Sequence, residues 1–253
     1  MYTQPRAHDG ASVAFDTAVA CAIRDVGVLV LLNTAFPAAP LNDVWKMLLV
    51  EMTVQAVEFG FYVTWIRRAR ATPHDMARVR YYDWFLTTPM MLFTLAAYMT
   101  YAADRHAADR HAVAGVSATN QPTLADGRGL TGFLKSEARY LACIAAANFG
   151  MLIVGFAAEG GHVSRPVAFV VGFLAMALSF GILWQRYARH SPDGRRLFSV
   201  VFVVWSLYGV AFMADPVTKN SVYNGLDVVS KNVFGLFLAY NLARAPKEQP
   251  STW

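Results

Sequence analysis

Apolar residues gather into seven long runs along the chain, and segments rich in charge, proline or glycine separate these runs. A helix rises about 1.5 Å per residue, so about 20 apolar residues cross the roughly 30 Å hydrocarbon layer of a bilayer. Backbone polar groups in lipid must be hydrogen-bonded inside the protein, so the pattern predicts an all-α membrane protein, a seven-transmembrane-helix bundle. The predicted spans cover residues 13–36, 44–66, 77–101, 137–158, 166–187, 197–214 and 220–243.

The segments between the runs are expected to be loops within one domain that covers residues 1–253. An odd number of spans places the two termini on opposite sides of the membrane. The longest separator, at about 103–135, is predicted as a polar loop, and its nearly doubled Ala-Asp-Arg-His-Ala motif raises the question of a metal site at His106 and His111. Residues five apart on a helix diverge by about 140°, so we expect a solvated loop and no metal site.

Composition supports the membrane assignment. The chain is 56% hydrophobic and 15% charged, whereas soluble domains average about 45–50% and about 25%. The net charge of +5 comes from basic residues that lie between the apolar runs, which favours lipid headgroups over nucleic acid as the partner. Cys21 and Cys143 lie inside apolar runs, so we expect two small core residues and neither a disulfide framework nor a metal-ligand cluster.

Charged residues inside the predicted spans carry the functional information. Each costs about 2.5–3.5 kcal/mol at the middle of a bilayer, so such residues usually face a partner or a water-filled path. In the last span, Asp227 precedes Lys231 by four residues, so both project from one face of the helix. An intrahelical ion pair at a surface is a poor explanation within an apolar run. A desolvated lysine amine is suited instead to imine formation.

The second and third spans carry two further polar stripes. Arg80, Asp83 and Thr87 lie on one face of the third span, where they are expected to share a hydrogen-bonded network. The second span carries Glu51, Gln55 and Glu58 within a narrow arc. A dry polar seam between helices explains Gln55 alone, but two carboxylates in the same stripe favour hydration and a route for cations.

Three segments together resemble the microbial (type I) rhodopsins: RYYDWFLTTP at 80–89, WSLY at 205–208 and DVVSK at 227–231. The resemblance extends over essentially all seven spans. It implies a photoreceptor rather than an enzyme, with all-trans retinal bound to Lys231 as a protonated Schiff base. Asp83 and Asp227 would oppose the buried cation, with Arg80 and Thr87 beside them. Buried carboxylates of this kind are what keep such a cation charged.

The same resemblance implies a retinal pocket. Trp84 and Trp205 would pack on the polyene, and Tyr208 would bond to Asp227. Two positions depart from the pump pattern, because Gly209 replaces a proline and Phe212 replaces a tryptophan. Thr88 and Phe212 are further candidates for the pocket wall. So are Asn148, Met151, Gly155 and Met176, for each of which ordinary core packing is almost as good an explanation.

Channel, pump and sensor remain open alternatives. The position of the proton donor in the pump archetype is Thr94, and the position of a release-side glutamate is Lys219, so a pump would be handicapped. Cation channelrhodopsins resemble the chain in the second-span glutamates and in the asparagine after the retinal lysine, and channel-forming viral rhodopsins are similar. This resemblance implies a gate at Glu58 and Asn232, with Glu51 and Gln55 along the path.

The leading hypothesis is therefore a light-gated cation channel in a lipid bilayer. An outward proton pump is the runner-up, and a sensor without transport is the third class. The transported species would be monovalent cations or protons, and the family resemblance implies a homo-oligomer. Asp25 in the first span is a candidate partner of the gate, and an ion pair with Arg24 is the alternative.

Overall fold

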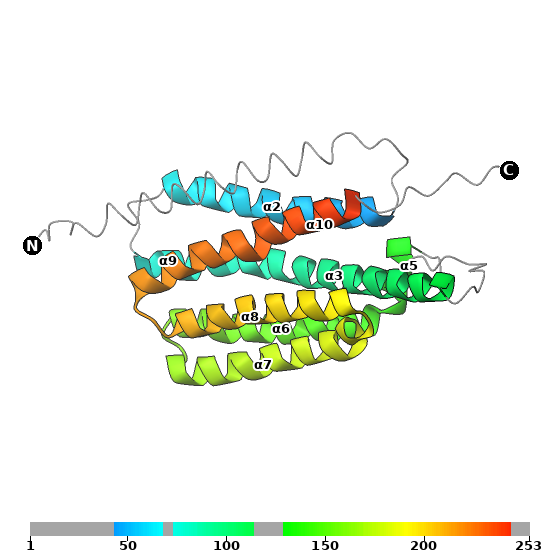
Figure 1. The fold of residues 1–253 in the computed structure, drawn as a ribbon. Coiled ribbons are helices and arrows are strands. Elements are labelled where there is room, and N and C mark those ends of the chain that lie inside the picture. The colour runs from blue at the N-terminus through cyan, green and yellow to red at the C-terminus, as the bar shows by residue number, and fades with distance from the viewer. Residues whose placement is uncertain (1–42, 68–72, 114–128, 244–253) are drawn as a thin grey trace, which may run out of the picture.

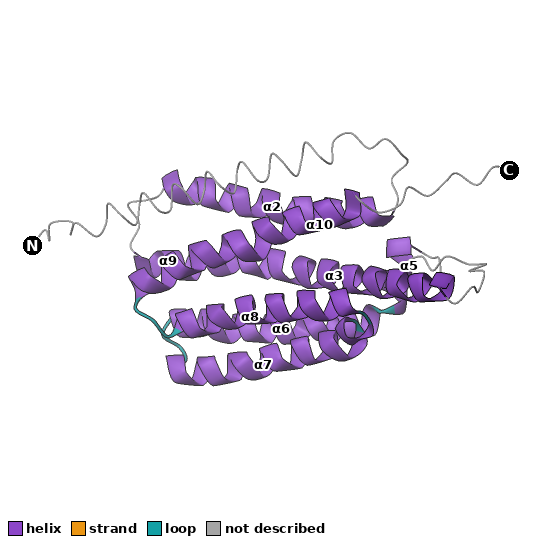
Figure 2. Ribbon diagram, in the orientation of Figure 1, coloured by secondary structure: helices purple, strands orange, loops and turns teal. Residues whose placement is uncertain are grey.

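A computed structural model describes residues 43–67, 73–113 and 129–243. Six of the seven predicted spans lie in this part of the chain and all six are helical, whereas the span at 13–36, with Cys21, Arg24 and Asp25, lies outside it. The helices run side by side in a bundle (Figure 1), and helices make up nearly all of the described chain (Figure 2). The bounds are α2 Asp43–Arg67, α3 Pro73–Val113, α5 Gly129–Ser136, α6 Ala138–Glu159, α7 Arg165–Arg186, α8 Pro192–Phe212, α9 Pro216–Asp227 and α10 Phe234–Ala243.

Four described helical segments are long and apolar enough to cross a membrane: Lys46–Thr64, Ala138–Glu159, Arg165–His190 and Pro192–Phe212. The outer faces of these helices are apolar, as Leu174 at 67% exposure and Leu178 at 60% show on α7. This arrangement reverses the pattern of a soluble protein. It also corrects the prediction for Cys143, which is exposed rather than a core residue, because an apolar residue of a membrane helix can face lipid as well as protein.

The predicted loop at 103–135 is wrong in part. Helix α3 continues to Val113, past the ends of α6 and α8 (Figure 1), and α5 forms before the fourth span begins. Alanine recurs through residues 102–112 and has the highest helix propensity, which explains the extension. His106 and His111 therefore lie on a helix and not in a loop. Residues 43–67, 73–113 and 129–243 contain no group of three or more metal-ligating side chains.

Two helix starts follow from local sequence. Ser191 caps α8 by accepting a hydrogen bond from the backbone N–H of Gly194 at 2.9 Å, and α8 therefore begins five residues before the predicted span. Asp215 caps α9 in the same way through Val217 and Thr218, both at 3.1 Å. A proline follows each cap, where its missing N–H leaves no helical bond unmade.

The seventh span is not one regular helix. Between α9 and α10, residues Val228–Val233 form a π-helical segment, and this segment contains Lys231 and Asn232. Such wide turns occur mostly as short insertions at functional sites. The sequence pattern gave no sign of this feature, because the apolar run continues through it.

Candidate functional site

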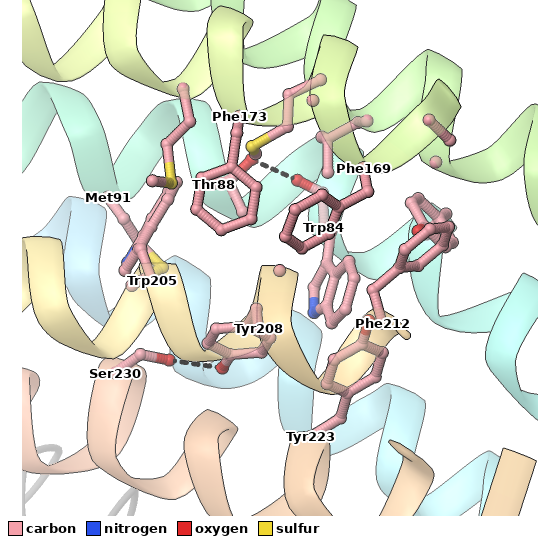
Figure 3. A pocket seen from close by; sticks show the side chains of 18 of the residues that line it. Trp84, Thr88, Met91, Phe169, Phe173, Trp205, Tyr208, Phe212, Tyr223 and Ser230 are labelled. Carbon is pink, nitrogen blue, oxygen red and sulfur yellow. Dashed lines mark hydrogen bonds between the residues drawn. The ribbon is translucent and has the colours of Figure 1, made fainter. Parts of the chain in front are cut away.

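A pocket inside the bundle is lined by residues of α3, α6, α7, α8, α9 and the π segment (Figure 3). Its walls are mainly aromatic and aliphatic, and Lys231 is one of the lining residues. Eight of the nine residues predicted for the pocket wall line this cavity: Trp84, Thr88, Met151, Gly155, Met176, Trp205, Tyr208 and Phe212. Asn148 is the exception, because it lies behind the wall and donates a hydrogen bond to Thr88 Oγ1 at 2.7 Å.

Three carboxylates surround the Lys231 amine. Its Nζ donates a hydrogen bond to Asp83 Oδ2 at 2.5 Å, and it lies 3.4 Å from Glu58 Oε1 and 3.7 Å from Asp227 Oδ1. The four side chains are at most 2% exposed. Charges buried this deeply are tolerated only when they are paired and hydrogen-bonded. Asp83 is therefore the nearest acid to the amine, with Glu58 second.

Arg80 forms a second layer below this cluster. Its guanidinium donates to Asp227 Oδ2 at 2.5 Å, to Tyr62 Oη at 3.1 Å and to Asn224 Oδ1. The tyrosines of α2 and α8 donate to the same carboxylate, Tyr62 at 2.8 Å and Tyr208 at 2.7 Å, so the predicted bond between Tyr208 and Asp227 is present in the structure. Asp227 thus accepts hydrogen bonds from three side chains of other helices, whereas Asp83 accepts one from the Lys231 amine.

The predicted network of Arg80, Asp83 and Thr87 along one face of α3 does not form as such. Thr87 donates to the backbone carbonyl of Asp83 at 3.0 Å and not to its carboxylate. Arg80 donates hydrogen bonds to residues of α2 and α9 and also lies over the Trp84 ring of its own helix, 6.0 Å from the ring centre. A shared helix face sets direction, but the long arginine side chain reaches a neighbouring helix more readily than the adjacent turn.

The polar stripe of α2 faces the π-helical segment. Asn232 Nδ2 donates to Glu58 Oε2 at 3.2 Å. Gln55 Nε2 donates to the backbone carbonyl of Lys231 at 2.9 Å and to Glu51 Oε1 at 3.2 Å. We call these residues, Glu51, Gln55, Glu58 and Asn232, the α2–π seam. The structure thus brings the predicted path and gate residues together beside the amine.

The seam contains polar atoms that its own side chains do not satisfy. Within the described part of the chain, three buried oxygens accept no hydrogen bond, namely Glu51 Oε2, Gln55 Oε1 and Asn232 Oδ1, while Glu58 Oε1 has the ion pair with the Lys231 amine at 3.4 Å. Buried acceptors of this kind are normally paired with protein, water or an ion. A fully dry seam therefore accounts for the geometry less well than a hydrated one.

The two positions that differ from the pump archetype have other structural partners. Thr94 is fully buried and donates to the backbone carbonyl of Met90 at 2.9 Å. Lys219 forms a buried ion pair with Glu159 of α6. This acid was not identified from the sequence, because a residue at the end of an apolar run is normally assigned to the surface.

Sequence reasoning also missed Asn224, Tyr223 and Phe173. Asn224 holds Arg80, and a signal was available, since it lies one turn before Asp227 on the same helix face. Tyr223 packs edge-on against Trp84 with ring centroids 5.1 Å apart. Phe173 lines the pocket and gave no separate signal within a continuous apolar run.

The pocket fits the retinal expected from the sequence. Its lining is mostly apolar, as a polyene requires, and Tyr208 and Ser230 are hydrogen-bonded to each other at the residue before Lys231. Asp83 Oδ1 is a buried acceptor without a partner among the described residues, directly beside that amine. Lys231 would hold the aldehyde end, and Trp84 and Trp205 would enclose the chain.

The sequence matches the family model described as bacteriorhodopsin-like protein over residues 23–245. Among curated protein sequences none matches this chain significantly. Similar solved structures include the viral rhodopsin OLPVRII, with 21% identity, a TM-score of 0.71, and coverage of 92% of this chain and 98% of that one. The thermophilic rhodopsin from Rubrobacter xylanophilus has 15% identity and a TM-score of 0.66, with 92% and 96% covered.

A light-driven proton pump from Leptosphaeria maculans is also similar, with 15% identity, a TM-score of 0.63, and coverage of 95% of this chain and 98% of that one. At these identities the likeness concerns the fold, and it confirms the predicted seven-helix class. The family itself rests on the match across most of the sequence. The chain therefore belongs to the bacteriorhodopsin-like proteins, the microbial rhodopsins, which are multi-pass membrane proteins that use a retinal chromophore.

Proposed function

We propose that the protein is a light-gated cation channel. All-trans retinal, bound to Lys231 as a protonated Schiff base, would supply the absorption of light and the change of shape that starts the cycle. The observation that carries the proposal is the α2–π seam, where Glu51, Gln55, Glu58 and Asn232 place buried acceptors along one line beside Lys231.

Asp83 is the group placed to take up a proton when light changes the pocket. It is the nearest carboxylate to the amine, at 2.5 Å, whereas Asp227 is already held by Arg80 and two tyrosines. Neutralising Asp83 removes a negative charge from beside Lys231. The electrostatic attraction between Lys231 and Glu58, whose Oε1 lies 3.4 Å from the lysine Nζ, then changes as well.

Two hydrogen bonds join α2 to the π segment at the seam, from Gln55 to the backbone carbonyl of Lys231 at 2.9 Å and from Asn232 to Glu58 at 3.2 Å. The bond between Glu58 and Asn232 is the one that closes the seam between two side chains. Because Asn232 follows Lys231 directly, a displacement at Lys231 moves the asparagine with it. Breaking this bond would leave an amide and a carboxylate facing each other across a polar gap, which is an arrangement that hydrates and attracts cations.

An outward proton pump remains the second candidate because a similar structure is that of a proton pump. It would need a group that returns a proton from the side opposite Asp83. Thr94, at the donor position, is a hydroxyl bonded to a carbonyl of its own helix and cannot supply a proton near neutral pH.

Photocurrents in a voltage-clamped cell would test the proposal. A channel gives a current whose reversal potential follows the gradient of the permeant cation. Glu58→Gln should reduce the current because it removes the charge at the closure, while Glu137→Gln, a matched change outside the seam, should leave it unchanged. A current that keeps one direction at every voltage would support the pump, and light absorption with no current would support a sensor.

A further inference from the structure

A second cavity lies beside the retinal pocket, between α8 and the π segment with the start of α10. Its volume is about 370 Å³. Valine, leucine and phenylalanine side chains form most of its wall, and Asp193 and Arg196 line it at the N-terminal end of α8. We call it the α8–π crevice. It is lined in part by Tyr98, Leu197, Val201, Val204, Phe234 and Phe237.

The crevice opens on the outer face of the bundle. Five of its lining residues are exposed: the charged residues Asp193 and Arg196 at the start of α8, and the valines Val200 of α8 at 60% and Val229 and Val233 of the π segment at 43% and 52%. By contrast, every described residue that lines the retinal pocket is buried or half-buried. A molecule as large as retinal therefore reaches Lys231 through those residues only if buried or half-buried side chains move aside.

Only a thin wall separates the two cavities. Trp205 and Ser230 line both of them. The wall is held by a hydrogen bond of 2.8 Å between Tyr208 and Ser230, which Figure 3 shows next to Trp205. A rotation of Trp205 and release of this bond would join the crevice to the pocket within one residue of Lys231.

The α7–α8 side of the pocket is closed more firmly. Gly209 of α8 lies directly under the Phe173 ring, so close that a Cβ at this position would lie 2.4 Å from a ring carbon. The missing side chain lets Phe173 fill the space between the two helices. An entry on this side would have to displace a packed aromatic ring that also contacts Phe169, with ring centroids 4.7 Å apart.

We propose that the α8–π crevice is the entrance through which retinal passes from the bilayer to Lys231. The inference rests on the proposed binding of retinal by this pocket. Retinal is a long apolar molecule that dissolves in lipid, and an apolar crevice with an exposed valine rim matches it. The adjoining π segment supplies a backbone whose hydrogen bonding is already irregular, so it can yield more easily than a regular helix.

The test measures how fast colour develops when all-trans retinal is added to retinal-free protein in lipid nanodiscs. Val200→Trp and Val233→Trp place an indole in the mouth. Each should slow colour formation about tenfold or more, equivalent to an added barrier of about 1.4 kcal/mol. The final absorption maximum and amplitude should equal those of the wild type, because bond formation at Lys231, with loss of the aldehyde oxygen as water, is the same.

Val210→Trp is the matched control. Val210 lies on the same helix at 58% exposure and lines neither cavity, so its replacement should leave the rate at the wild-type value. Equal rates in the wild type and all three tryptophan variants would overturn the entrance and leave the crevice as a site for a lipid acyl chain. If the wild type itself stays colourless, the proposed function fails rather than the route.

A widened mouth gives a second, opposite test. The double change Val200→Ala with Val233→Ala removes volume from the rim and leaves the pocket residues in place. Faster colour formation supports the entrance, and an unchanged rate overturns it. This variant decides the question if a tryptophan variant does not fold.

Discussion

The buried ion pair between Lys219 and Glu159 gives a prediction whose size follows from the structure. Lys219 is 0% exposed and Glu159 is 4% exposed, and the lysine Nζ lies 5.8 Å from the centre of the Phe212 ring. Removing one partner leaves the other charge buried without compensation, which costs about 3–5 kcal/mol. Lys219→Met or Glu159→Leu alone should therefore lower the free energy of unfolding by that amount. This corresponds to an increase of about 10²- to 10⁴-fold in the equilibrium constant for unfolding.

The double variant separates charge from packing. With Lys219→Met and Glu159→Leu combined, neither charge remains, and apolar side chains fill similar volume. Such replacements are often neutral or stabilising by about 1–4 kcal/mol. The double variant should thus be far more stable than either single one, with a coupling energy that a double-mutant cycle measures directly.

The assay is unfolding of the purified protein by increasing mole fraction of sodium dodecyl sulfate, followed by circular dichroism and by the visible absorbance. Arg196→Gln serves as the control, because its pair with Asp193 has side chains that are 82% and 71% exposed and should contribute less than about 1 kcal/mol. Single variants as stable as the wild type would show that the pair is solvated. A double variant as unstable as the sum of the two single ones would show that packing, and not charge, sets the cost.

Two further predictions concern the pocket wall and the N-terminal end of α6. Gly209→Ala should push the Phe173 ring aside, shift the absorption maximum and lower the stability by about 1–3 kcal/mol through overpacking. Gly181→Ala is the control, because a Cβ there has nothing within 4 Å, and it should leave the spectrum and the stability unchanged. An unshifted spectrum of Gly209→Ala would contradict the prediction. The Arg186 guanidinium holds the pKa of Glu137 below its ordinary value of 4.5. The wild type should therefore exceed Glu137→Gln in stability by the full amount above pH 4.5, and this difference should be lost as the pH falls through the lower, folded-state pKa of Glu137. Unfolding midpoints of the two proteins from about pH 7 to about pH 3 measure the difference. A difference that stays constant over this range would refute the prediction.

The sequence was enough to predict the helical spans and the central charges because both depend on local rules. Apolar length predicts a span, and a lysine such as Lys231 inside one must have partners. What it could not give was the choice of partner across helices. Arg80 shares a face with Asp83 but bonds to Asp227, because the bundle brings α9 within reach of its long side chain.

Features that depend on the packing of distant elements were also missed. The ion pair of Glu159 with Lys219 joins two helix ends that are far apart in the chain. The extension of α3 to Val113 was not predicted, because the charged residues of the Ala-Asp-Arg-His-Ala repeat interrupt the apolar run despite its alanines. The spans at 44–66 and 137–158 agree closely with α2 and α6, because each is bounded by charge and contains no proline.

The π-helical segment has a consequence for how the chain can change by insertion or deletion. On a regular helix, Asp227 and Asn232 are five residues apart and would point about 140° away from each other. In a π turn, the residue five positions on is the hydrogen-bonding neighbour, so one residue can reach the Arg80 layer while the other meets Glu58. Deleting a single amino acid between them would place the two residues four apart on a regular helix, about 40° from each other, so the two halves of the site would keep nearly the same facing while the wide turn beside Lys231 is lost.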